Sequence, residues 1–273
     1  MDRLRGSVSR RTAAVVFGFV VTGAWPLRGA AADHCEPSAP PALQGESTAA
    51  KFALRLGIER ANYANERYSG NFAGLGLGTV LTGQAWDVSL DASLYHLVKN
   101  GLDVFGPGDP FVRGRVRVWQ AEGNTLALGV ALGLSAPLGD AQAGLGMGHF
   151  MIHPGIWLGT RGEHVRTEWS LGYGRVLGDG EHGEPTGPLV SPMNSSELSA
   201  GAALSWDLHP QLALRALGLG AVPVAAPQGE ARLMAGFGAR LVLGALALSV
   251  TASFPVVGDP FTDKLEFGIG YSF

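Results

Sequence analysis

The sequence has few charged residues and a single cysteine. Charged residues make up 16% of the 273 positions, whereas an average soluble protein has roughly 25%. Because Cys35 is the only cysteine, the chain can form no intramolecular disulfide. The residues before it, Ala32-Asp33-His34, do not resemble the small residues that precede a lipidated cysteine. These scarcities argue against a disulfide-rich scaffold and against an ordinary soluble surface.

Basic charge is also scarce. The formal net charge is −3, and removing residues 1–32, which hold five arginines and one aspartate, leaves 15 basic and 22 acidic residues. Proteins that bind nucleic acid usually carry a basic surface. We therefore expect no nucleic-acid partner.

Long apolar runs are nearly absent. Only residues 236–254 approach the roughly 20 apolar residues of a membrane helix. Arg240 in the interior, Gly244 and the run of β-branched and small polar residues from Val250 to Ser253 disfavour a helix there. We interpret this stretch as parts of two strands.

The first 32 residues have the pattern of a secretory signal peptide. Arg3, Arg5, Arg10 and Arg11 precede an apolar segment at 13–24, and three alanines at 30–32 offer a cleavage site. Residues 33–50 are rich in Pro, Ala and Ser, which predicts a flexible periplasmic segment. Residues 51–273 remain as the folded part of the chain.

Apolar residues alternate with small or polar ones throughout residues 51–273. A period of two indicates strands that have one apolar and one polar face. The twelve segments with this pattern are 51–64, 71–82, 85–98, 111–122, 125–136, 147–160, 164–177, 196–208, 211–221, 230–242, 245–255 and 263–273. The connections alternate between tight turns and longer loops such as 99–110, 137–146 and 177–195.

This regularity predicts an all-β fold. We expect a transmembrane, antiparallel, up-and-down β-barrel of about twelve strands in a bacterial outer membrane, with short periplasmic turns and longer extracellular loops. The 41 glycines suit strands that pack small groups on one face. The alternative is a soluble β-sandwich, which gives no reason for loop length to alternate along the chain.

The last eleven residues show the alternation most clearly. Phe267, Ile269, Tyr271 and Phe273 are large and apolar, and the residues between them are small or polar. A terminal Phe after such a strand resembles the C-terminal signal of bacterial outer-membrane proteins. The resemblance implies that the barrel-assembly machinery is a partner through this strand.

The charged side chains fall mainly on the face opposite the apolar one. A charge facing the middle of a bilayer costs about 2–4 kcal/mol, so this face is expected to line a lumen. The main candidates are Arg55, Glu59, Asp87, Asp91, Arg113, Arg115, Arg117, Arg166, Glu168, Arg215, Arg232 and Arg240, and Asp207, Glu230, Lys264 and Glu266 share their face. The three arginines of segment 111–122 form either a cationic patch or structural pairs with Asp87 and Asp91.

Aromatic residues recur near the predicted strand ends on the apolar face. Amphipathic rings at such positions form girdles at the two membrane interfaces, and the outer-membrane lipid is the implied partner. The girdle candidates are Trp86, Trp169, Tyr173, Trp206, Phe254 and Tyr271. Core aromatics of a soluble sheet are the alternative.

We find no pattern typical of an enzyme. His149 and His153 would share one strand face, but a separation of about 13 Å is too long for one metal ion. Asn194-Ser195-Ser196 fall in a predicted loop. We therefore predict no catalytic residue, metal or cofactor.

One segment resembles a known family. Residues 133–159 (GLSAPLGDAQAGLGMGHFMIHPGIWLG) are similar to a segment of the outer-membrane family named for the MetA pathway of phenol degradation, with Pro137-Leu138-Gly139 in place of Pro-Thr-Gly. The resemblance implies a barrel that passes small, often hydrophobic or aromatic compounds. We thus expect a passive pore for a small-molecule solute. The alternative is a closed structural or surface-interaction barrel without a conducting pore.

Overall fold

The computed structural model describes residues 50–64, 69–177, 190, 193–224, 231–258 and 261–273. The predicted signal peptide and all of segment 33–50 except Ala50 lie outside these residues. The strands are β1 (Lys51–Ala64), β2 (Ser69–Thr82), β3 (Trp86–Lys99), β4 (Leu102–Pro107), β5 (Phe111–Gln120), β6 (Leu126–Ser135), β7 (Phe150–Arg161), β8 (Val165–Leu177), β9 (Ser196–His209), β10 (Leu212–Pro223), β11 (Arg232–Leu243), β12 (Leu246–Val257) and β13 (Phe261–Ser272). A single 3-10 turn, Glu122–Asn124, precedes β6 among these described residues.

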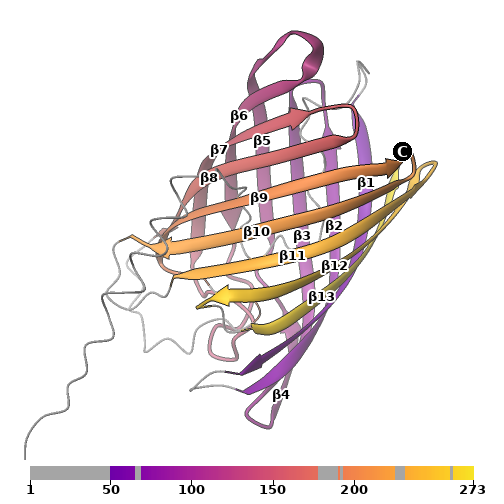
Figure 1. Ribbon diagram of the computed structural model, residues 1–273. Coiled ribbons are helices and arrows are strands. Elements are labelled where there is room, and N and C mark those ends of the chain that lie inside the picture. Colours follow the sequence, from indigo (N-terminus) through magenta and orange to yellow (C-terminus); the bar gives the residue numbers. More distant parts are fainter. Residues whose placement is uncertain (1–49, 65–68, 178–189, 191–192, 225–230, 259–260) are drawn as a thin grey trace, which may run out of the picture.

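The strands close into one antiparallel ring (Figure 1). β1 pairs with both β2 and β13, so the first and last strands seal the sheet. β4 and β5 both pair with β3 and together fill one position, which gives a ring of twelve. Closure leaves no long sheet edge unpaired within the described strands. The predicted barrel of about twelve strands is confirmed.

The connections differ between the two rims of the barrel. Those after β2, β5, β7, β9 and β11 have at most five residues and lie at the rim where β1 begins and β13 ends, called here the turn rim. The two longest connections, 136–149 and 178–195, lie at the opposite loop rim. Most of the second one lies outside the described residues. The predicted short turns are therefore found at the turn rim, and the two longest loops lie at the loop rim, but the loop rim also has short connections, such as 258–260 after β12.

The prediction of a loop at 99–110 is wrong. Asn100 and Gly101 adopt positive φ angles of 49° and 83°, which suit a tight two-residue hairpin turn between β3 and β4. The hairpin projects past the neighbouring strands at the bottom of Figure 1. On β3, Asp91 pairs with Phe111 and Leu94 pairs with Pro107. The three residues 108–110 therefore lie opposite only two residues of β3, Ala92 and Ser93. This β-bulge separates β4 from β5.

Apolar side chains cover the outside of the barrel. On β3, Val88, Leu90 and Leu94 are exposed, whereas the alternating Ser89 and Asp91 are buried toward the inside. Residues 236–254 form parts of β11 and β12 rather than a membrane helix. Across the described ranges, no helix has the length and apolar character needed to cross a membrane.

The C-terminal strand is paired on both sides. β13 lies between β12 and β1. The backbone N–H of Phe273 donates to the carbonyl of Phe52 at 2.9 Å. The Phe273 ring packs against the rings of Phe52 and Tyr271 at centroid distances of 5.6 and 4.9 Å. The end of the chain is therefore held at the junction where the barrel closes.

Candidate functional site: the polar lumen

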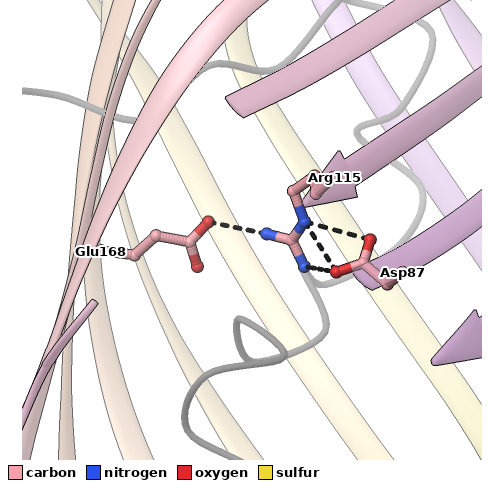
Figure 2. A network of polar contacts seen from close by, with 3 residues as sticks. All are labelled: Asp87, Arg115 and Glu168. Atoms are coloured by element: carbon pink, nitrogen blue, oxygen red, sulfur yellow. Dashed lines mark hydrogen bonds and ion pairs between the residues drawn. The ribbon is translucent and has the colours of Figure 1, made fainter. Parts of the chain in front are cut away.

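Ion pairs occupy the lumen, and one network surrounds Arg115 (Figure 2). Its guanidinium group donates two hydrogen bonds from Nε to the Asp87 carboxylate at 3.1 and 2.9 Å, and a terminal nitrogen lies 2.7 Å from the same carboxylate. The other terminal nitrogen donates to Glu168 at 3.1 Å. Asp87 lies on the neighbouring β3, but Glu168 lies on β8, beyond β6 and β7. Arg115 therefore spans part of the lumen.

Other predicted lumen residues form ion pairs around β1. Arg55 on β1 pairs with Asp91 on β3 at 3.3 Å. Lys264 on β13 lies 3.0 Å from Glu59 and 3.1 Å from Glu266. These pairs connect β1 to strands on both of its sides.

Two further pairs lie on β8 to β11. Arg166 on β8 donates to Asp207 on β9. Arg232 on β11 donates to Glu197 on β9 at 2.7 Å. Glu197 also accepts hydrogen bonds from the backbone and the side chain of Asn194. Sequence reasoning missed Glu197, which alternates with Leu198 at the start of β9 and could have been found from that pattern.

The remaining predicted lumen residues are arginines on three strands. Arg113 and Arg117 flank Arg115 at alternate positions of β5, and Arg215 and Arg240 lie on β10 and β11. Asp91 pairs with Arg55 rather than with an arginine of β5. Of the two alternatives for the β5 arginines, a structural pair is therefore found for Asp87, whereas Asp91 pairs with Arg55 on β1. Glu230 lies outside the described residues.

Inward glycines let these long side chains meet across a strand. On β2, Gly78 lies between Arg55 and Asp91 in the register, and Gly74 lies between Glu59 and Tyr95. A Cβ at Gly74 would lie 2.7 Å from the Glu59 carboxylate and 2.8 Å from the Tyr95 ring. Such distances are too short for non-bonded atoms, so these contacts require glycine at that position.

The loop between β6 and β7 folds into the loop-rim half of the lumen. Leu145 is only 2% exposed and belongs to an apolar cluster with residues of the wall. The members of this cluster are Ala61, Tyr63, Phe72, Tyr95, Leu97, Leu145, Val190, Met234 and Phe261. A prediction from alternation could not find this contact, because a loop has no period that fixes where its side chains point.

Asp109, in the bulge between β4 and β5, holds this loop. Its carboxylate accepts hydrogen bonds from the backbone N–H of Gly139 at 2.8 Å and of Met147 at 2.6 Å. These two donors lie on either side of Leu145. A Cβ at Gly146 would lie 2.4 Å from the Asp109 carboxylate. The Asp109 carboxylate in the bulge therefore binds the β6–β7 loop on both sides of Leu145.

The girdle candidates lie at different depths. Trp86, Trp206 and Tyr271 are exposed on the outer face near the turn rim. Phe254 is exposed on the outer face near the loop rim. Trp169 and Tyr173 lie farther inside β8 and are half-buried, and they contact the hydroxyl groups of Thr167 and Ser196.

The two histidines occupy different environments. β7 begins at Phe150, so His149 belongs to the preceding loop and its predicted place in a strand is wrong. His153 is buried in the lumen, with its ring 5.5 Å from the Phe111 ring. Among the residues that the structure describes, no group of three or more His, Cys, Asp or Glu side chains could hold a metal ion.

These features define a closed, twelve-stranded transmembrane β-barrel whose lumen wall carries ion pairs and whose loop-rim half contains an inserted loop. Its fold is similar to that of the KdgM porin, with a TM-score of 0.51 and 6% identity over 81% of this chain and 99% of that chain. The NanC porin gives a TM-score of 0.52 and 9% identity over 81% and 98% of the two chains. No family model matches the chain, and no curated protein is similar to it in sequence. The structural similarity to these two porins therefore shows that the chain has the same kind of fold.

Proposed function

We propose that the protein is an outer-membrane pore for the passive passage of small solutes. The observation that carries this proposal is the lumen wall of the turn-rim half, where Arg115, Arg55 and Arg166 pair with carboxylates instead of packing into an apolar core. Arg166 and Asp207 are 26% and 33% exposed, so this pair can contact water in the lumen, and the apolar outer face is compatible with hydrocarbon.

The orientation follows from the rims. The turn rim, with both ends of the barrel, would face the periplasm, and the loop rim would face outward. Trp86, Trp206 and Tyr271 would lie in the periplasmic interface and Phe254 in the outer one. The paired C-terminal strand is the segment that we expect the barrel-assembly machinery to engage.

Two observations support a hydrophobic or aromatic solute. The stretch 133–159 resembles the family named for the MetA pathway of phenol degradation. The wall of the loop-rim half also carries the rings of Tyr63, Phe72, Tyr95 and Phe261, which are buried against Leu145 and which a solute would meet only after the inserted loop moves. An acidic solute is the other possibility, because a structure of the KdgM porin holds a disordered oligogalacturonate.

The inserted loop favours a second function. Leu145 and the surrounding rings fill part of the loop-rim half, as expected for a closed structural or surface-interaction barrel. In a pore, the same loop would form the constriction. The two functions therefore differ in whether water and ions pass beside Leu145.

Single-channel recording of the refolded protein in a planar bilayer distinguishes them. We expect discrete conductance steps. Charged and neutral aromatic compounds of equal size would then be tested as blockers of the current. A correctly folded barrel that gives no steps at any protein concentration, and none with Asp109→Asn, would favour the closed barrel.

A further inference from the structure

Positive charge on the outer face of the barrel lies only in the loop-rim half. Among the outward-facing residues of the described strands, only Arg60 on β1 and Arg175 on β8 are Lys or Arg. Arg60 follows the exposed Ile58 by two residues and Arg175 follows the exposed Leu171 by four, so each shares the face of these apolar side chains. Both arginines are themselves exposed.

Arg175 lies near the outer edge of the apolar band. Val165 begins β8 at the turn rim and pairs in register with Trp206, a girdle candidate at that rim. Arg175 follows Val165 by ten residues. At a rise of about 3.3 Å per residue and a strand tilt of about 40°, ten residues advance about 25 Å along the barrel axis. The apolar band of such a barrel is about 25 Å tall. Arg175 therefore lies where hydrocarbon gives way to lipid headgroups.

Two hydroxyl groups lie beside Arg175. β8 and β9 run side by side (Figure 1), and Ser196 on β9 is the register partner of Arg175. Tyr173 lies two residues before Arg175 on the same face, and its hydroxyl oxygen is 2.9 Å from that of Ser196. A contact between two hydroxyls uses only one of their protons. The Tyr173 hydroxyl can therefore accept from Ser196 and donate to an anion beside Arg175.

The surface around Arg175 carries no negative charge of its own. Within the described residues, no Asp or Glu shares the outer face of β7, β8 and β9. Glu197 follows Ser196 along β9 but faces the lumen, where it accepts from Arg232. An arginine at the edge of the hydrocarbon is stabilised by an opposite charge in the headgroup layer.

Arg60 has a different neighbourhood. Asn62 lies two residues beyond it on the same face and donates to the Asp263 carboxylate at 3.0 Å. This carboxylate would repel an anion that approaches Arg60. Arg175 is therefore the better site for an external anion.

Apolar side chains continue from Arg175 toward the turn rim. Leu171 on β8 and Ile156 on β7 are register partners, and they are 42% and 51% exposed on the outer face. A guanidinium group binds phosphate through two parallel hydrogen bonds. The complementary ligand is thus a phosphate that carries acyl chains, because a free phosphate ion would make no contact with these apolar side chains.

We propose that Arg175 and Tyr173 bind a phosphate group of an outer-leaflet lipid whose acyl chains pack beside Leu171 and Ile156. The assignment to the outer leaflet rests on the orientation proposed above. The site itself does not depend on conduction, because it lies on the outside of the barrel.

Lipid titration of the folded protein in neutral detergent micelles, followed by native mass spectrometry, tests the site. The probe is lipid A with two phosphates, and the control lipid is the same molecule without phosphates. Arg175→Gln and Tyr173→Phe are the test variants. Lys51→Gln is the control variant, because Lys51 is exposed at the turn rim and its loss changes the net charge equally. Far-UV circular dichroism confirms that each variant is folded.

We expect the phosphorylated lipid to bind more tightly than the control lipid. Arg175→Gln should weaken this binding by about tenfold or more, which corresponds to one charge-assisted hydrogen bond. Tyr173→Phe, which keeps the ring, should weaken it by a smaller factor, and Lys51→Gln should leave it unchanged.

Three results would overturn the inference. They are equal binding of the two lipids, binding that Arg175→Gln leaves unchanged, and displacement of the lipid by an equimolar amount of inorganic phosphate, which would indicate a site for the free ion. Arg175-dependent lipid binding by a barrel that conducts no ions would retain the site and contradict the pore.

Discussion

Arg115 allows a test of how firmly the lumen network holds the barrel. Its side chain is 3% exposed and that of Asp87 is 1% exposed. Arg115→Met removes the cation and leaves the Asp87 carboxylate buried without its partner. Breaking a buried pair in this way costs about 3–5 kcal/mol. We expect a loss of that size in the free energy of unfolding, measured by urea titration of the protein in phospholipid vesicles.

A partner variant and a control complete this test. Asp87→Asn in the Arg115→Met background should recover a large part of the loss, because the buried charge is then gone. Arg166→Met removes the cation of a more exposed lumen pair, whose side chains are 26% and 33% exposed, and should cost about 1 kcal/mol or less. A loss below about 1 kcal/mol for Arg115→Met, or no recovery with Asp87→Asn, would refute the reasoning.

Two further predictions concern the membrane face and the inserted loop. Val250→Arg places a charge on the outer face of β12 and should destabilise the barrel by about 2–4 kcal/mol in the same urea titration. Thr251→Arg should cost much less, because Thr251 faces the lumen opposite Glu266. Equal losses for the two variants would contradict the assigned facing. Asp109→Asn removes the charge that accepts the Gly139 and Met147 amides, a loss of about 1.5–3 kcal/mol in charge-assisted hydrogen bonds. The freed loop should raise single-channel conductance or its fluctuations, and unchanged currents would show that the loop does not limit the pore.

The strand pattern can be predicted from sequence because lipid imposes it. An outer face in hydrocarbon must be apolar and a wet inner face need not be, so alternation marks each strand and its facing. The predicted segment 51–64 has the same bounds as β1. Pairing of the last strand is predictable because its backbone groups need partners.

The non-local contacts cannot be predicted in the same way. The run Gly106-Pro107-Gly108-Asp109-Pro110 has the composition of a loop, yet it closes a strand and forms a bulge that clamps Leu145. The contact between Arg115 and Glu168 depends on barrel curvature across β6 and β7. Alternation gives the facing of a residue, but partners across the lumen depend on the radius and stagger of the closed sheet.

The accessibility of neighbouring residues to a membrane-impermeant thiol reagent tests the central claim most directly. Leu204 is exposed on the outer face of β9, and Ser205 faces the lumen opposite Arg166. In a Cys35→Ser background and in sealed vesicles, Ser205→Cys should react, and Leu204→Cys should react only after the lipid is dissolved. Reaction of Leu204→Cys in intact vesicles together with an unreactive Ser205→Cys would contradict an apolar outside around a water-filled lumen.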